Sequence, residues 1–120
     1  SLEKRSRMPT PSINRIQIIG TVEGLPQMKQ TNKSNYLEVK IKTVDPYVSK
    51  SGAKETIEIH EVRIYGQQAN FNFDMLGIND IVYVEGALRS YERRFYIRSK
   101  LTRLLAKSNG APNVYPQRKI

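Results

Sequence analysis

The chain has 120 residues, 38% of them hydrophobic and 26% charged, a balance typical of one globular domain with a modest core. It has no cysteine and one histidine, His60, which excludes disulfides and thiolate metal sites and leaves few ligands for zinc or for histidine-based catalysis. Twenty lysines and arginines against eleven acidic residues give a net charge of +9, which favours a polyanionic partner, most commonly nucleic acid.

The first third of the chain predicts an arm and two strands. Residues 1–12 contain two prolines and several basic residues and are expected to form a flexible basic arm. Residues 13–22 alternate in character around a glycine, Gly20, as a bent strand does. After a polar loop over 27–34, residues 36–43 alternate strictly between apolar and charged side chains and predict the second strand.

Residues 44–55 are expected to form a long basic connection that leads into the third strand, over 56–65. Side chains alternate between the two faces of a strand. With Val62 on the core side of this strand, Arg63 and Tyr65 are therefore expected to share its outward face.

The rest of the chain predicts one helix and a final hairpin. Over 68–76, the apolar residues Ala69, Phe73 and Leu76 fall at i, i+4 and i+7, the spacing of a short amphipathic helix. Two further strands are expected, over 81–88 and 95–104. A disordered tail is expected over 106–120, where glycine and proline lie among polar residues.

The order of these elements is strand, strand, strand, helix, strand, strand, with the helix between the third and fourth strands. This is the chain order of an OB-fold, an all-β, five-stranded Greek-key barrel that binds oligonucleotides on one face. The sequence therefore predicts an OB-fold domain over 13–105. Other small β-barrels share the strand count, and the position of the helix is what favours the OB-fold.

Cations and aromatic rings recur together at outward-facing strand positions and in the connections. Binding of an unpaired strand without sequence preference requires cations for the phosphates and rings on which bases stack. The candidate nucleic-acid-binding residues are Arg15, Lys40, Lys42, Tyr47, Lys50, Lys54, Ile59, Arg63, Tyr65, Arg89, Tyr91, Arg93, Arg94 and Phe95. Any one of them is equally well explained as part of a solvated face, but the same pairing in three separate segments favours nucleic acid.

No catalytic constellation is found in the sequence. The acidic residues and the glycines are scattered singly, so neither a carboxylate pair nor a phosphate-binding loop is expected. His60 lies on the apolar side of the third strand, where a buried or interface histidine, with Glu58 as a potential partner, is more plausible than a ligand. No apolar run approaches the ~20 residues of a membrane span. We therefore expect no enzymatic activity, no cofactor, no metal and no membrane contact.

Three segments carry a resemblance to a known family. They are Asn14-Arg-Ile-Gln-Ile-Ile-Gly20, His60-Glu-Val-Arg-Ile-Tyr-Gly66 and Val82-Tyr-Val-Glu-Gly86. In order and spacing they resemble the single-stranded DNA-binding proteins of bacteria and mitochondria. The resemblance covers residues 13–105 and implies a protein that coats and protects unpaired DNA during replication, with replication proteins as possible partners.

The resemblance also implies roles for single residues. Tyr47 and Tyr65 stand where the family has rings that stack on bases, whereas Ile59 stands where a tryptophan is usual and removes one stacking platform. Tyr91 and Phe95 could supply the remaining ring. The family assembles as homotetramers, which makes the histidine at position 60 a candidate for the oligomer interface.

The resemblance further implies a cellular setting. Bacterial members end in an acidic tail, whereas this chain ends in a basic segment and does not begin with methionine. These features look most like a mitochondrial member, located in the matrix or nucleoid, with a bacterial, plasmid or phage homologue as the alternative.

Two other functions remain compatible with the sequence. One is an RNA-binding OB-fold subunit of an RNA-processing complex, since the sequence gives no test of a preference for the 2′-hydroxyl. The other is a structural OB-fold subunit whose charge is incidental to protein assembly, a possibility strengthened by the absence of tryptophan.

Overall fold

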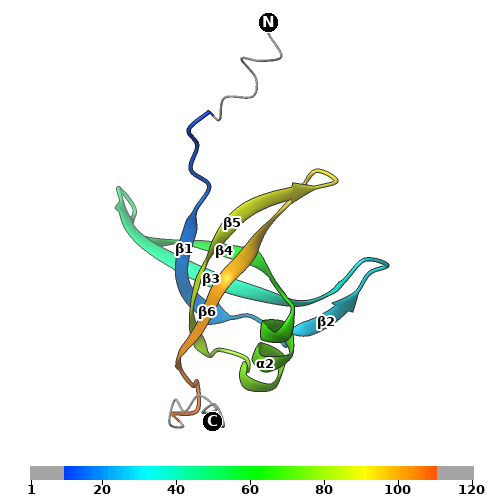
Figure 1. Cartoon of the computed structure of the whole chain (residues 1–120). Coiled ribbons are helices and arrows are strands. Elements are labelled where there is room, and N and C mark those ends of the chain that lie inside the picture. Colours follow the sequence, from blue (N-terminus) through cyan, green and yellow to red (C-terminus); the bar gives the residue numbers. More distant parts are fainter. Residues whose placement is uncertain (1–9, 111–120) are drawn as a thin grey trace, which may run out of the picture.

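The computed structural model describes residues 10–110. Most of the expected arm over 1–12 and residues 111–120 of the expected tail therefore lie outside the described residues. The described elements are β1 (Ile16–Val22), β2 (Gln27–Gln30), β3 (Asn35–Ser49), β4 (Gly52–Tyr65), α2 (Gln67–Met75), β5 (Ile81–Tyr91) and β6 (Arg94–Ala106) (Figure 1).

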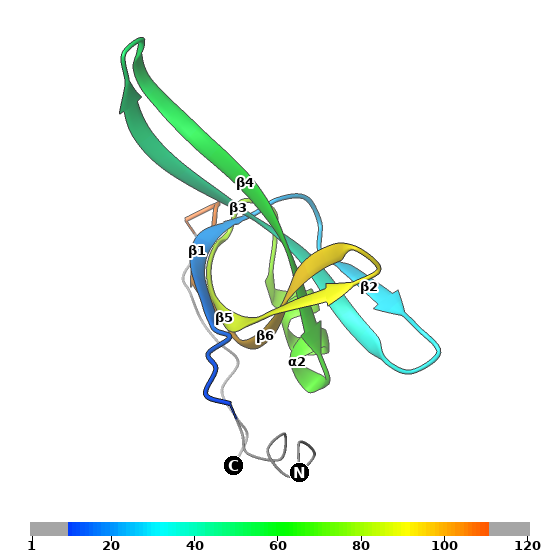
Figure 2. The ribbon, with the colours of Figure 1, turned by 90° about the horizontal axis from the view of Figure 1, so that it is seen from above.

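Five strands close into a barrel. The sheet order is β1-β5-β6-β4-β3-β2, and a further pairing of β1 with β3 closes the ring, with β2 as an additional strand beside β3. All pairs are antiparallel except β4 with β6. Figure 2 gives a view into the ring. With the helix α2 between β4 and β5, this arrangement confirms the predicted OB-fold.

The core is aliphatic and comes from alternate positions of the barrel strands, as the period-two patterns predict. Its fully buried strand residues, each no more than 4% exposed, are Val22, Leu37, Val39, Ile41, Val62, Ile64, Val82, Val84, Ile97 and Leu104. The helix α2 covers one end of the barrel (Figure 1). The residues between these positions point to the outer surface of the barrel and are not required for the core.

Two glycines allow strands to approach each other closely at bends of the barrel. A Cβ atom at Gly20 would lie 2.3 Å from the carbonyl oxygen of Lys42, and one at Gly86 would lie 2.1 Å from that of Arg98. Gly86 also borders a register irregularity between β5 and β6. Because the obstructing atoms belong to the backbone, no side-chain movement could make room for a larger residue.

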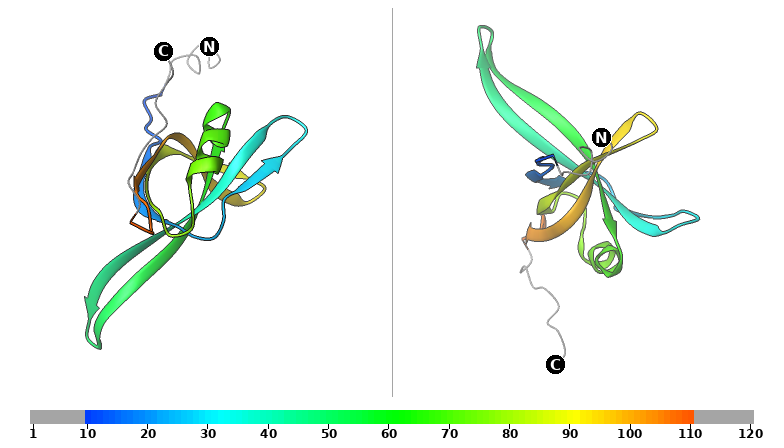
Figure 3. Two further views of the ribbon diagram at one scale, coloured as in Figure 1. Left: turned by 90° about the horizontal axis from the view of Figure 1, so that it is seen from below. Right: turned by 45° about the horizontal axis from the view of Figure 1, so that its top comes forward.

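Two segments expected as loops are strands. Residues 27–30 form β2, where Gln27 lies opposite Glu38 and Gln30 opposite Asn35, and residues 44–55 continue β3 and β4 as a two-stranded ribbon up to the turn at Lys50 and Ser51. Both faces of this ribbon are largely exposed, so it has no apolar alternation to reveal it. The ribbon, the β2–β3 hairpin and the β5–β6 hairpin project from the barrel in different directions (Figure 3).

The helix buries a different stripe from the one expected. Ala69 and Leu76 are buried as predicted, but Phe73 is 47% exposed and the buried residue between them is Asn72. Ala69, Asn72 and Leu76 follow the spacing i, i+3, i+7, which is equally compatible with one face of a helix. The amide nitrogen of Asn72 donates to the carbonyl oxygen of Gln68 at 2.8 Å, whereas its amide oxygen is buried without a hydrogen-bond partner among the described residues.

The folded domain continues past the expected start of the tail. Ala106 ends β6, and the next two residues bind the buried carboxylate of Asp80: the Lys107 ammonium donates at 2.7 Å and the Ser108 amide at 2.9 Å. The amide of Gly77 is a third donor, at 2.8 Å. Burial alone would raise the pKa of Asp80, but these bonds outweigh it and hold that pKa below its ordinary value.

A first prediction concerns Gly86. Replacement by alanine is expected to destabilise the fold by about 1–3 kcal/mol, because the new methyl group overlaps a backbone carbonyl. Thermal unfolding followed by circular dichroism measures this. Gly77→Ala is the matched control, since its Cβ atom would meet Asp80 at an ordinary 3.6 Å. Equal melting temperatures for the two variants would contradict the proposed close approach.

A second prediction concerns pH. Because the pKa of Asp80 is lowered in the folded state, its stabilising effect is fully present above the unfolded pKa of about 4 and is lost as pH falls through the folded value. Asp80→Asn is therefore expected to cost about 1–3 kcal/mol at neutral pH and progressively less below pH ~4. Urea unfolding at several pH values measures this, with the exposed Asp74→Asn as control. A pH-independent difference would contradict it.

Candidate nucleic-acid interface

The outer face of the β3–β4 pair carries a row of polar and aromatic side chains. Residues directly opposite each other in an antiparallel pair point to the same side. The opposed pairs on the outer side are Tyr36 with Tyr65, Glu38 with Arg63, Lys40 with Glu61, and Lys42 with Ile59. The residues between them, including Leu37, Val39 and Val62, form the core. The alternation that builds the core thus also builds the row.

The strand β6 adds two residues to this row. It runs parallel to β4, with Val62 beside Ile97 and Arg63 beside Arg98, so Tyr96 and Arg98 share the outward side. The Arg63 guanidinium lies 3.9 Å from the ring centroid of Tyr96 and 4.6 Å from that of Tyr36. We call five residues of this face the Tyr–Arg cluster: Tyr36, Arg63, Tyr65, Tyr96 and Arg98.

The cluster is a connected set of stacked groups. The Arg98 guanidinium lies 4.7 Å from the ring centroid of Tyr65, and the rings of Tyr65 and Tyr36 are 5.4 Å apart at an interplanar angle of 40°. Cations over aromatic faces are attracted by the ring quadrupole, typically by about 0.5–1 kcal/mol at exposed sites. Three rings and two cations from three strands therefore hold one another in place on the barrel surface.

The charges within the cluster are well defined. Burial would lower the pKa of Arg63, but hydrogen bonds with Glu61 and Tyr65 outweigh it and raise that pKa, so the guanidinium stays charged. Its Nε atom donates to Glu61 at 2.9 Å. Burial also raises the pKa of Tyr36, despite the opposing charge of Arg63, which keeps the phenol neutral. Within the cluster, the Arg63 cation thus lies against the neutral ring of Tyr36.

The β5–β6 hairpin extends the outward face. Arg89 lies opposite Tyr96, and Tyr91 lies opposite Arg94, so Arg89, Tyr91 and Arg94 point to the side of the cluster. The hairpin turns at Glu92 and Arg93, both with positive φ, as in a two-residue type I′ turn. This turn places Arg93 at the exposed tip. The structure therefore places Arg89, Tyr91 and Arg94 on the side of Arg63 and Tyr65, and Arg93 in the turn.

Phe95 points the other way. It lies opposite Ser90 on the reverse face of the hairpin and lines an apolar hollow of about 260 Å³ at the barrel wall, together with Ile59 and His60. Ile59 is 48% exposed at the far end of the β3–β4 row. Both residues offer apolar surface near the row, but neither belongs to the Tyr–Arg cluster.

The predicted residues of the long ribbon are not in the cluster. Tyr47 lies opposite Lys54, at positions that share a side with Ile41 and His60 rather than with Arg63 and Tyr65. Tyr47 and Tyr65, the two residues that stand where the family has stacking rings, therefore lie on opposite faces of the β3–β4 pair. The reason is that β3 continues in register beyond Thr43, so alternation assigns Tyr47 to the opposite face. Lys50 lies in the turn at the end of the ribbon.

The remaining predicted cations occupy separate positions. Lys40 is exposed in the outward row, and the Lys42 ammonium lies 3.9 Å from the Glu23 carboxylate. Arg15 lies apart from the cluster, where its Nε atom donates to Glu85 at 3.0 Å. Hydrogen bonds from Arg15 and Tyr83 lower the pKa of Glu85, which keeps this acid charged beside Arg15.

His60 has a partner on the neighbouring strand. Its Nε2 atom lies 2.9 Å from the Thr43 hydroxyl, so Thr43 and not Glu58 satisfies it. The ring is half-buried and borders the apolar hollow near Ile16 and Ile18. A role at an oligomer interface stays a prediction.

Three members of the cluster are absent from the sequence-based candidates: Tyr36, Tyr96 and Arg98. Tyr36 lies an even number of residues from Lys40 and Lys42, and Tyr96 and Arg98 lie an even number from Arg94. Because alternate residues of a strand share a face, the sequence already indicated that they share a face with these cations. The information that the sequence lacked is the parallel pairing of β4 with β6, which puts these residues beside Arg63.

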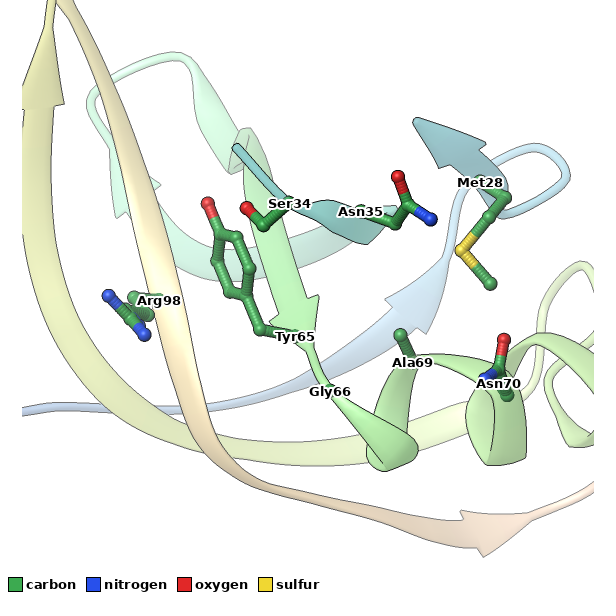
Figure 4. Close-up of a pocket in the computed structure, with 8 residues that line it drawn as sticks. All are labelled: Met28, Ser34, Asn35, Tyr65, Gly66, Ala69, Asn70 and Arg98. Atoms are coloured by element: carbon green, nitrogen blue, oxygen red, sulfur yellow. The ribbon is translucent and has the colours of Figure 1, made fainter. Parts of the chain in front are cut away.

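A polar cleft adjoins the cluster. Tyr65 and Arg98 form one side of a space of about 630 Å³ between the β2–β3 hairpin and the start of α2 (Figure 4). Its other lining residues are Met28, Ser34, Asn35, Gly66, Ala69 and Asn70.

Other kinds of site are not found in the part of the chain that the structure describes. Over residues 10–110, no group of three or more histidine, cysteine, aspartate or glutamate residues is arranged to hold a metal ion. The one helix described there is too short to cross a membrane.

Comparison with known proteins agrees with this geometry. The model of the single-strand binding protein family matches residues 13–103. A "Single-stranded DNA-binding protein" of Thermus thermophilus is 32% identical over 93 residues, which cover 74% of this chain and 35% of that protein. The chain thus spans about a third of the length of this curated relative.

Solved structures show the same fold. The wild-type single-stranded DNA binding protein from Thermus aquaticus aligns with a TM-score of 0.66 at 26% identity, covering 81% of this chain and 52% of that one. The Plasmodium falciparum SSB in complex with ssDNA aligns with a TM-score of 0.63 at 22% identity, covering 77% and 90%. Because the family model matches most of its length, the chain belongs to the single-strand binding protein family, whose members are DNA-binding proteins and not enzymes, as the sequence predicts.

Proposed function

We propose that the chain binds single-stranded DNA, without strong dependence on sequence, across the Tyr–Arg cluster. The observation that carries this proposal is the placement of three rings and two guanidinium groups from β3, β4 and β6 on one outward face. Each base that stacks on such a ring contributes about 1–3 kcal/mol, and stacking tolerates every base because each has a π-face.

The cations around the cluster fit two roles. Arg63 lies between the rings of Tyr36 and Tyr96 and is bonded to Glu61, so it orients the rings and has little capacity left for phosphates. Arg89, Arg94 and Lys40 are exposed on the same side and suit the phosphates of a strand that passes over the rings. Each phosphate neutralised on a single strand contributes about −0.7 to the slope of log K against log salt.

The relatives support the same ligand. The Thermus thermophilus relative is named for binding single-stranded DNA, and the Plasmodium falciparum structure contains it. The chain spans 35% of that first relative. We propose further that it acts in DNA replication and contacts replication proteins.

We propose a mitochondrial setting, with a bacterial or phage origin as the alternative. Microscopy of the tagged protein in its native cell would decide between them.

A third prediction tests the binding face. Tyr96→Ala is expected to weaken binding of a thymidine oligomer by about 1–3 kcal/mol, or at least about fivefold in Kd, because one stacking ring is lost. Titration of the intrinsic tyrosine fluorescence at several salt concentrations measures affinity, stoichiometry and charge dependence together.

The matched control for Tyr96 is Phe73→Ala, which removes an exposed ring from α2, outside the cluster. Tyr47→Ala reports separately whether the ribbon takes part. No response of the wild-type protein to thymidine oligomers in dilute buffer would refute the proposed function. Tighter binding of a uridine oligomer of equal length would redirect it to RNA.

We also propose that the chain assembles with itself as a homotetramer, with His60 in a contact between subunits. The support is the half-buried position of His60 beside an apolar hollow lined by Ile16, Ile18, Leu88 and Phe95. An apolar surface of this kind is costly to expose to water.

The fourth prediction follows from this assembly. Sedimentation velocity is expected to give four times the chain mass for the wild type, and His60→Ala is expected to dissociate at higher concentrations than the wild type. The exposed neighbour Glu58→Ala serves as control. A wild-type monomer at every concentration would exclude the assembly without affecting the proposal on DNA.

A further inference from the structure

The cleft beside Tyr65 lies next to the Tyr–Arg cluster but differs from it in chemistry. On one side is the Tyr65 ring, with the Arg98 guanidinium 4.7 Å from its centroid. On the opposite side is the thioether of Met28, and the amides of Asn35 and Asn70 lie at its margin (Figure 4). An aromatic ring facing an adaptable thioether suits a flat apolar group between them.

The two amides are available for a ligand. Among residues 10–110, neither the Asn35 nor the Asn70 side chain has a hydrogen-bond partner, and both are exposed to the cleft. Each primary amide carries two donor hydrogens and one acceptor oxygen. They come from different elements, Asn35 from the start of β3 and Asn70 from α2. A ligand between them would therefore meet hydrogen-bonding groups from two directions.

The size and position of the cleft suit one nucleotide. Its volume of about 630 Å³ falls within the range of about 300–1,000 Å³ that small-molecule sites typically have. Tyr65 belongs both to the cleft and to the cluster, so a strand that stacks on Tyr36 and Tyr96 passes its entrance. A base that is rotated away from the stacked bases at Tyr65 would enter the cleft while its neighbours in the strand stay on the cluster.

We propose that this cleft binds one adenine base of the bound strand and adds a preference for that base to otherwise sequence-tolerant binding. The inference rests on the proposed function. An asparagine amide pairs with adenine through two hydrogen bonds, donating to N7 and accepting from the N6 amino group. Thymine has no amino group and carries a methyl group on the corresponding edge. Because the two amides lie on different sides of the cleft, one can pair with N7 and the N6 amino group of adenine while the other holds the base in its orientation.

The test uses the full chain and a set of thymidine oligomers of equal length. One is unsubstituted, and each of the others carries a single central dA, dG or dC. The dA oligomer is expected to compete at least about fivefold more effectively than the unsubstituted one. Asn35→Ala and Asn70→Ala are expected to remove this advantage and to leave the affinity for the unsubstituted oligomer unchanged, because neither residue belongs to the cluster.

Asn32→Ala is the matched control, since it removes an exposed amide from the same hairpin, outside the cleft. Equal competition by all four oligomers against the wild type would overturn the inference, as would a preference for dA that survives in the double variant Asn35→Ala, Asn70→Ala. In either case binding to thymidine oligomers would persist and the proposed function would stand. Failure of every oligomer to bind would refute the proposed function and the adenine site with it.

Discussion

The parallel contact between β4 and β6 is the constraint on which both the fold and the candidate site depend. Its two register pairs are Val62 with Ile97 and Arg63 with Arg98. The first pair is buried, at 1% and 4% exposure, and joins the two halves of the barrel core. The second pair points outward and brings the Tyr–Arg cluster together. Because the pairs are adjacent in sequence, the barrel cannot close without assembling the cluster.

Elements whose two faces differ could be predicted from the sequence. The barrel strands alternate because one face is core and the other is solvent, and the core residues Leu37, Val39 and Ile41 follow from that pattern. The β3–β4 ribbon could not be predicted, since solvent lies on both of its sides and no periodic signal arises, and β2, at four residues, is too short to show a period. The helix α2 is short, so its sequence is compatible with burial of either of two faces. Packing on the barrel buries the face with Asn72 and leaves Phe73 exposed.

The candidate site was predictable only within single strands. Parity along β4 correctly puts Arg63 and Tyr65 on one side, and parity along the hairpin puts Arg89, Tyr91 and Arg94 there. Which strands lie side by side is a property of the closed barrel. This is why the sequence does not predict that Tyr96 and Arg98 join the cluster, and why the face of Tyr47, in an expected connection, cannot be assigned from the sequence.

The distribution of arginine and lysine indicates that stacking, more than net charge, defines the face. Acidic residues Glu38 and Glu61 lie in the same row as Arg63, so the charge excess of the chain is not concentrated there. Both cations that contact rings are arginines, whereas Lys40 and Lys42 occupy positions without a ring contact in the described structure. A planar guanidinium stacks on an aromatic ring and still presents N–H donors at its edge, which a lysine ammonium cannot do. The cluster is therefore a continuous series of contacts from Tyr96 through Arg63, Tyr36 and Tyr65 to Arg98, held together by its rings and guanidinium groups.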